Sequence, residues 1–202
     1  PAEDLVLYRA EMADWPGRGE LRGWQHEIAD WVDDNNACRL DILDLLRSDG
    51  PLRTRDLPDT CVRPWRSTGW TNNKNVQRML DFLVQRGEVA VAAREAGERL
   101  WDLAERVYPD EPPLPWEDAL VERARRRLAA LGIARAKATA TPAEPNDVGG
   151  VGEAAVVEGL RGQWRLDPAY LDLGPLEGRV ALLSPLDRLV FDRKRMAEIF
   201  EF

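Results

Sequence analysis

The sequence predicts a mainly helical α+β fold, and three observations support this prediction. Residues 20–103 follow the order helix, short helix, helix, two-stranded hairpin, as judged from helical and then strand periodicity of the apolar residues. A Pro-rich stretch interrupts the chain at residues 109–115, and a fainter copy of the same order follows it. That order is typical of a winged helix, a helix-turn-helix with a small β-hairpin wing, so we expect tandem winged-helix domains.

These patterns divide the chain into five parts. They are an N-terminal segment (1–19), a winged-helix domain (20–108), a linker (109–115), a second, degenerate winged-helix domain (116–172) and the start of a C-terminal segment (173–202). Four prolines in the linker prevent a helix or a central strand there. Because the chain starts without an initiator Met and ends as a helix ends, we expect a longer parent protein.

The first domain should begin with two helices between Glu20 and Arg47, or with one helix broken around Asn35. Apolar residues form two clusters there, and the polar run at residues 33–36 separates them. Gly50 and the proline after it stop the second helix. A short helix is expected over Leu52–Leu57.

The third helix carries the clearest apolar stripe. Thr71 or Asn72 is expected to cap it, and it should run to residues 86–87 with Val76, Met79 and Leu83 facing the core. Residues 88–93 and 99–103 then form a hairpin, with a turn at residues 94–98 that contains a glycine. In the second domain, helices are expected at 116–131, 134–139 and 151–160, a loop at 141–150 and a strand at 162–166. A strand at 179–183 and a helix at 192–200 follow.

Composition excludes several functional classes. The longest apolar run, Val89–Ala93, is far shorter than the roughly 20 residues that a membrane span needs. The first residues do not resemble a signal peptide, so we expect a cytoplasmic protein that does not contact membranes. Two cysteines and one histidine, His26, cannot form a four-ligand zinc site of Cys and His alone. We expect neither a metal nor a cofactor.

The net charge of −8 argues against nucleic acid, but the charges are unevenly distributed. Residues 61–86 carry five basic and one acidic side chain, and residues 121–140 carry six and one. Salt limits the reach of each charge to about 8–10 Å, so a local basic face is what binds phosphate. Both segments are equally compatible with solvated helix faces.

The start of the third helix is the candidate DNA-binding site. In this fold that helix enters the major groove, where amides bond adenine and basic side chains bond guanine or phosphate. The alternative is that the asparagines only cap the helix. The candidate contact residues are Asn72, Asn73, Lys74, Asn75, Gln77 and Arg78, together with Arg66 of the preceding loop.

Other polar and aromatic features have simpler interpretations. The run of Arg123, Arg125, Arg126 and Arg127 should lie largely off the apolar face of its helix, to track phosphates or, preferably, to sit beside acidic neighbours. Three of the eight tryptophans are expected in the core and two at the helix entry, where packing is preferred over stacking on bases. The core set is Trp24, Trp31 and Trp101, and the entry pair is Trp65 and Trp70.

Three stretches together resemble a bacterial family. They are Gly50–Leu57, then Gly69-Trp70 with Lys74 and residues 80–89, and most specifically Ala181–Arg193 with its Ser-Pro-Leu-Asp and Phe-Asp-Arg motifs. The family comprises tandem winged-helix DNA-binding proteins and includes DNA glycosylases for alkylated and crosslinked DNA. The resemblance implies duplex DNA as the partner and a parent chain with a winged helix upstream and a β-rich segment downstream.

The catalytic motif that the resemblance implies is missing from these residues. It consists of Gln, a hydrophobic residue and then Gln or Asp, and none of Gln25, Gln77, Gln85 and Gln163 begins such a triplet. No catalytic residue is therefore assigned, and any enzyme activity would belong to the parent. The sequence predicts the DNA-binding portion of a repair glycosylase. The alternative is a non-catalytic transcription regulator or protein-interaction module.

Overall fold

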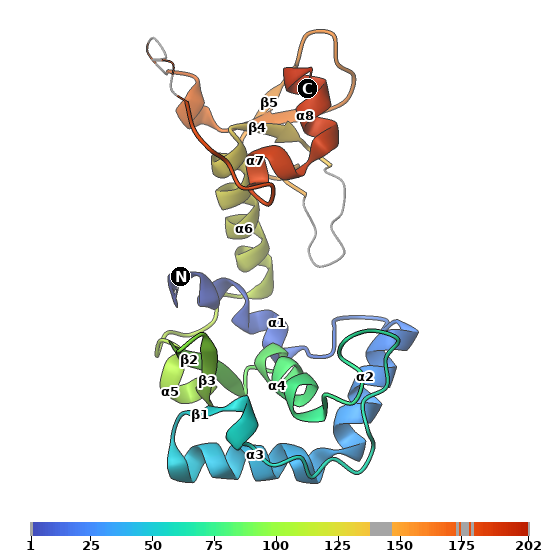
Figure 1. Ribbon diagram of the computed structural model, residues 1–202. Coiled ribbons are helices and arrows are strands. Elements are labelled where there is room, and N and C mark those ends of the chain that lie inside the picture. Colours follow the sequence, from blue (N-terminus) through green and yellow to red (C-terminus); the bar gives the residue numbers. More distant parts are fainter. Residues whose placement is uncertain (1, 138–146, 173, 175–177, 179, 202) are drawn as a thin grey trace. The chain divides into compact units, whose positions relative to one another are not determined.

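The computed structural model describes residues 2–137, 147–172, 174, 178 and 180–201. The fold is α+β and mainly helical, as predicted, with two small antiparallel three-stranded sheets (Figure 1). The chain divides into two compact units, Pro1–Trp116 and Glu117–Phe202. Among the described residues, no helix is both long enough and apolar enough to span a membrane.

Unit 1 begins with helices that meet at Asn35. A 3-10 helix (Ala2–Leu7) and α1 (Arg9–Ala13) precede α2 (Gly23–Asp34) and α3 (Asn36–Asp49), so the predicted break at Asn35 is confirmed. Asn35 is buried, and its side chain bonds the carbonyl oxygen of Trp31 (2.8 Å) and both backbone groups of Arg63 (3.0 and 2.9 Å). A buried amide must be satisfied, so this residue joins the break to the segment that precedes α4.

The first sheet corrects one prediction. Residues 52–57 are not a single short helix: β1 (Leu52–Arg53) pairs with β3, and only Thr54–Asp56 is a 3-10 helix. The backbone groups of Leu52 and Arg53 pair with the free edge of the hairpin, which local sequence does not reveal. Next come α4 (Asn75–Gln85), β2 (Val89–Glu95), β3 (Glu98–Leu103) and α5 (Ala104–Val107), and the strand order is β1-β3-β2.

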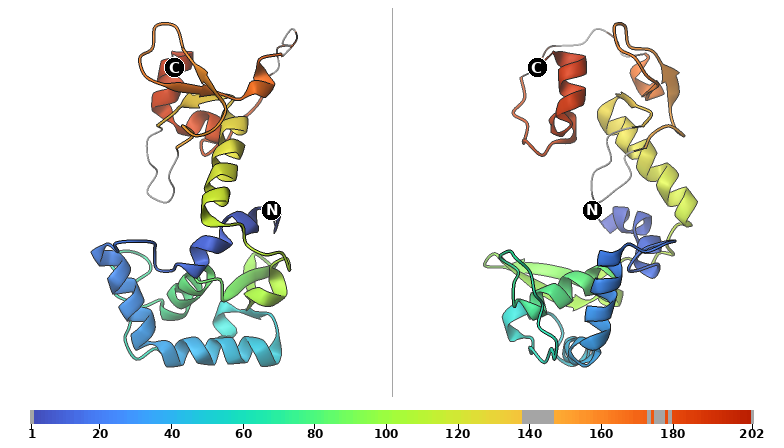
Figure 2. Two further views of the ribbon diagram at one scale, coloured as in Figure 1. Left: turned by 180° about the vertical axis from the view of Figure 1, so that it is seen from behind. Right: turned by 90° about the vertical axis from the view of Figure 1, so that its right-hand side faces the viewer.

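The predicted hairpin is confirmed, with a tighter turn than expected. Glu95 pairs with Glu98, so only Ala96 and Gly97 form the loop, both at positive φ (47° and 84°). Two left-handed residues make the turn whose twist matches paired strands. Figure 2 (right) shows the hairpin extending from the body of unit 1.

The core of unit 1 lies between α2, α3, α4 and the sheet. Met79, Leu80 and Leu83 of α4 are fully buried, which confirms the predicted stripe. Trp31 and Trp101 are also buried, as expected. Trp24 is 55% exposed, so its placement in the core was wrong: α2 buries only the side chains of its last turns.

Unit 2 confirms its first helix and its last. The helix α6 (Trp116–Leu131) has the predicted bounds, and α8 (Arg193–Phe200) starts where Asp192 accepts the backbone N–H of Arg195 (3.0 Å). The side chain of Arg195 is buried and bonds the carbonyl oxygens of Leu131 and Ile133 (2.9 and 3.2 Å). It therefore connects α8 to the last residue of α6 and to the first residue of β4.

Between these helices, several predictions are wrong. No helix forms at 134–137: β4 (Ile133–Arg135) is followed by a bend at residues 136–137, and residues 138–139 lie outside the described part. Residues 141–146 of the expected loop also lie outside it. The expected helix at 151–160 is β5 (Glu153–Ala155) followed by turns, because Ala154 pairs with Arg165 and the glycines on both sides hold positive φ. The strand β6 (Trp164–Leu166) confirms the prediction at 162–166 and gives the order β4-β6-β5.

The arginine run on α6 only partly follows its prediction. Arg123 and Arg127 are 7% exposed, so placing them off the apolar face was wrong: they lie one turn apart, on the face of Ala119. Arg125 and Arg126 form ion pairs with Glu122 (2.7 and 2.8 Å), which confirms the preferred interpretation that the run sits beside acidic neighbours. Near the end of the chain, residues 180–183 form no strand, and an unpredicted short helix, α7 (Arg188–Phe191), precedes α8.

Candidate nucleic-acid interface

A groove in unit 1 runs between the start of α4 and the β2–β3 hairpin. Its lining comes from the loop before α4, from the first two turns of α4 and from the hairpin tip. Of the seven predicted contact residues, Asn73, Lys74, Asn75, Gln77 and Arg78 line it. Asn72 and Arg66 lie in the adjoining loop, so the structure gathers the predicted set on one side of unit 1.

The asparagines hold the loop in shape, and none of them caps α4. The helix starts at Asn75 with Lys74 as its N-cap residue, so the expected cap at Thr71 or Asn72 was wrong. Asn72 accepts the backbone N–H of Ser67 (3.1 Å), and Asn75 accepts that of Trp65 (2.8 Å). These bonds fold the loop back on itself, because short amide side chains readily replace backbone partners in turns.

Asn73 occupies the left-handed region at φ 57°, which asparagine tolerates better than most residues. Its backbone N–H donates to the carbonyl oxygen of Trp65 (2.9 Å), and its side-chain oxygen accepts a bond from Arg66 (3.1 Å). Arg66 is thereby held at the rim of the loop. The N-terminal end of α4 is therefore presented on a preformed loop.

Asp81 restrains the two polar side chains that follow on α4. It accepts one bond from Gln77 (3.1 Å) and one from Arg78 (3.3 Å). The guanidinium of Arg78 also lies over the rings of Trp65 and Phe82, 4.7 and 4.6 Å from their centroids. Arg78 is thus anchored within the fold, and its charge is partly neutralised before any ligand arrives.

Trp65 and Trp70 behave differently. Trp65 packs beneath α4, edge to face with Trp31 and Phe82 at 5.3 and 5.4 Å, so the preferred packing interpretation is confirmed for it. Trp70 is 79% exposed, and the ammonium of Lys74 lies 4.8 Å from its ring centroid. The loop therefore presents one aromatic face and one cation together at the groove.

The hairpin adds two cations that the sequence prediction missed. Arg94 of β2 and Arg99 of β3 are opposite each other in the strand register, next to the turn, and both line the groove. Arg94 is exposed and has no ion pair or hydrogen bond with any other described side chain. The sequence did contain a sign of this contribution, because both arginines lie at the ends of the predicted turn. The acidic balance of residues 87–120 obscured it.

The charge of the groove is close to balanced. Lys74, Arg78, Arg94 and Arg99 face three acids of the lining, Asp59, Asp81 and Glu98. Glu98 in turn pairs with Arg53 and Arg55 at 3.6 and 3.2 Å. A few specific phosphate contacts fit this surface better than a broad basic footprint does.

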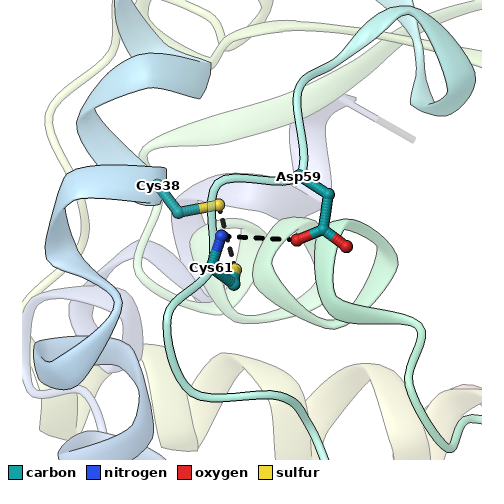
Figure 3. Close-up of side chains that lie close together, drawn as sticks. All are labelled: Cys38, Asp59 and Cys61. Carbon is teal, nitrogen blue, oxygen red and sulfur yellow. Dashed lines mark hydrogen bonds between the residues drawn. The ribbon is translucent and has the colours of Figure 1, made fainter.

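Beside the groove, three side chains with metal-ligating atoms lie together in the described part of the chain. They are Cys38, Asp59 and Cys61, whose ligand atoms all lie within 4.8 Å of one another (Figure 3). The sequence excluded a four-ligand zinc site of Cys and His alone and did not single out this cluster. The clustering depends on α3 meeting the segment before α4.

Comparison with known families supplies the context for this groove. The family model described as DNA glycosylase AlkZ-like matches residues 1–202, the whole chain. The chain belongs to this family. The suggested resemblance is thereby confirmed, and the family implies a role in DNA repair with DNA as the partner. No solved structure matches the chain.

Proposed function

We propose that residues 20–108 of this AlkZ-like family member form a winged-helix domain that binds duplex DNA. The order of α3, the 3-10 helix Thr54–Asp56, α4 and the β2–β3 hairpin supports this proposal, because a winged helix is a helix-turn-helix followed by a hairpin; β1 adds a third strand to that hairpin. In it, α4 is the recognition helix and the β2–β3 hairpin is the wing. Residues 109–115 then serve as a linker.

The observation that carries this proposal is the shared groove of α4 and the hairpin. A major groove accommodates one helix, and side chains beside that helix reach the flanking phosphates. Lys74 stands at the N-terminus of α4, and Arg94 and Arg99 stand on the wing. We assign phosphate contacts to these three and to Arg66, and base-edge contacts to the amides of Asn72 and Gln77.

Three predicted contacts remain, and each of them is already bonded to a neighbouring side chain. Asn75 donates to Asp59 (3.2 and 3.0 Å), and Asn73 and Arg78 are engaged as described above. In the proposal they position the helix and its loop, and they reach DNA only if it displaces those partners. Unit 2 has no helix at 151–160, so we assign it no recognition helix.

The proposal includes a substrate class and a location. Membership of a glycosylase family favours damaged DNA, and the bacterial resemblance favours alkylated or crosslinked duplex in the cytoplasm. These residues contain no Gln-hydrophobic-Gln or Gln-hydrophobic-Asp motif. We therefore assign binding of the duplex to this chain and base excision to another part of the parent protein.

One observation favours the alternative, a regulator or protein-interaction module. The acids in the groove nearly balance its cations, and the whole chain carries a net charge of −8. A basic or mixed-charge protein surface would also fit such a groove. The two functions differ in how binding responds to salt and to the loss of single cations.

Titration of a labelled duplex by fluorescence anisotropy at several salt concentrations tests the proposal. Each phosphate contact contributes about −0.9 to the log–log salt slope, so Lys74→Ala with Arg94→Ala should flatten the slope by about 2. Arg47→Ala is the matched control, because that exposed arginine pairs with Asp44 on α3, outside the lining of the groove. It should leave the slope unchanged. An unaltered slope in the double variant would remove α4 and the wing from the interface.

A further inference from the structure

The two cysteines of the chain are in direct contact. Cys38 lies in the first turn of α3 and is 0% exposed, and Cys61 lies, half-buried, in the segment before α4. The thiol of Cys61 donates to the sulfur of Cys38 across 3.0 Å, as Figure 3 shows. Both are free thiols, and they lie 23 positions apart in the sequence.

The contact changes the acidity of the pair. The hydrogen bond from Cys61, with smaller contributions from Thr60, lowers the pKa of Cys38 to about 7 despite its burial. The same bond raises the pKa of Cys61, and burial raises it further. Above pH 7 the contact therefore favours one thiolate and one thiol, and transfer of the shared proton places the thiolate on Cys61, the half-exposed sulfur.

The segment around Cys61 is already held against two helices. Thr60 donates to Asp41 of α3 (2.7 Å), and Asp59 accepts the backbone N–H of Cys61 (3.3 Å). Asp59 also accepts the side chain of Asn75, the first residue of α4. The sulfurs must approach each other by about 1 Å to reach disulfide length, and a bond between them would fasten the segment that leads to the groove.

We propose that Cys38 and Cys61 form a reversible dithiol–disulfide site that hydrogen peroxide oxidises. The thiolate attacks one peroxide oxygen, an S–O bond forms, the O–O bond breaks, and the released hydroxide takes up a proton to become water. The second sulfur, losing its proton, attacks the sulfenic sulfur; the S–S bond forms and the second oxygen leaves as water. Two thiols are oxidised by two electrons, and one peroxide is reduced to two waters.

The disulfide closes a loop over residues 38–61, which contains most of α3, β1 and the 3-10 helix Thr54–Asp56. Cross-linking removes conformational freedom from the unfolded chain, so the oxidised protein should be more stable than the reduced one. The bond also ties Asp59, and through it Asn75, to α3. Oxidation then strengthens the support of the proposed DNA-binding groove. The site itself does not depend on that function.

The test uses the full 202-residue chain, reduced and freed of reductant, then treated with equimolar hydrogen peroxide. We expect titratable thiols under denaturing conditions to fall from two to none, a mass loss of about 2 Da, and a monomer on non-reducing gels. The melting temperature should rise by at least about 5 °C and return after dithiothreitol. The Cys61→Ser variant should show neither the thermal shift nor its reversal. Its remaining thiol, that of Cys38, should still be oxidised to a sulfenic acid.

Other outcomes overturn the proposal. Two thiols that persist after peroxide treatment, or disulfides found only between chains, would show that the pair does not close. The metal content of the protein, measured before and after incubation with Zn²⁺, examines the competing use of the Cys38, Asp59 and Cys61 cluster. One tightly held Zn²⁺ per chain that protects both thiols from peroxide would replace the disulfide site with a metal site.

Discussion

Asparagine side chains determine how the loop before α4 is built. At Asn72 and Asn75 the side-chain oxygen accepts a backbone N–H from the other end of the loop, and at Asn73 the backbone adopts φ 57°. The same residue type favours caps, turns and adenine edges. The types of residue were therefore sufficient to locate a polar loop at a helix entry, and only their partners show which of these roles each one fills.

The cysteine pair predicts a pH dependence at the residue scale. The pKa of Cys38, about 7, lies below its ordinary value of 9.0, so its contribution to stability is present above 9 and is lost as pH falls toward 7. The raised pKa of Cys61 has the opposite effect on stability. Above pH 9 this thiol ionises in the unfolded chain but not in the folded one, so stability falls as the pH rises further. The pair should therefore contribute most to the stability of the reduced protein near pH 9.

Urea denaturation in the presence of reductant, from pH 6.5 to 10, measures this profile. The free energy of unfolding should rise between pH 7 and 9 with a slope of at most about 1.4 kcal/mol per pH unit. Cys61→Ala removes the thiol donor and should flatten this rise. Parallel profiles for the two proteins would show that the thiol contact does not set the acidity of Cys38.

At the scale of elements, α4 combines two opposed surfaces. One side is fully buried through Met79, Leu80 and Leu83, and the other lines the groove with Lys74 and Gln77. The buried side contacts the core that α2, α3 and the sheet share. The groove-facing side can therefore change without loss of the fold, whereas the buried side cannot.

Leu83→Ala should destabilise unit 1 strongly. The side chain is 0% exposed, and truncating a buried leucine typically costs about 2–5 kcal/mol through lost burial and the cavity left behind. Thermal unfolding followed by circular dichroism measures the loss. Gln85→Ala, two residues on and exposed, is the matched control and should change stability by less than about 0.5 kcal/mol. Equal effects of the two changes would mean that α4 does not pack as described.

At the scale of the whole molecule, the two small α+β units of the chain differ in the order of their helices and strands. Unit 1 has a long helix, α4, between its first strand and its hairpin, whereas unit 2 has one short strand, β5, where its third helix was expected at 151–160. Unit 2 gains its stability from α6, a three-stranded sheet and α8, which Arg195 attaches to the end of α6. The proposed DNA contacts are therefore confined to unit 1.

This chain alone should bind DNA without excising bases. Cleavage of a glycosidic bond requires a positioned water or a charge-stabilising group at the sugar, beyond flipping the base out. The side chains of the groove are cations, amides and paired acids, and the glutamine motif is missing from these residues.

Duplex that contains N7-alkylguanine, incubated with the protein and then treated with alkali, reports any excision as a strand break. We expect breaks at the level of spontaneous depurination. A higher level would point to a carboxylate of this chain, foremost Asp187 or Asp192 beside the arginines of the 181–193 stretch. A glycosylase that excises N7-alkylguanine, assayed in parallel, serves as the positive control.

Strong local patterns determined much of this protein from sequence alone. The break at Asn35, the stripe of α4, the hairpin around Gly97 and the helices α6 and α8 all depend on neighbours within a few residues. The family resemblance depended on the 181–193 stretch, a motif that is itself local. These features were predictable because helix and hairpin signals are encoded at short range.

Only the tertiary structure decided the features that require partners distant in sequence. Leu52–Arg53 and Glu153–Ala155 are strands because other strands offer free edges, and pairing overrides weak helical propensity. Arg94 joins the groove because the hairpin lies beside α4, and Cys38 meets Cys61 because α3 packs against a loop. Contacts between segments depend on the whole fold, and no local pattern of residues encodes them.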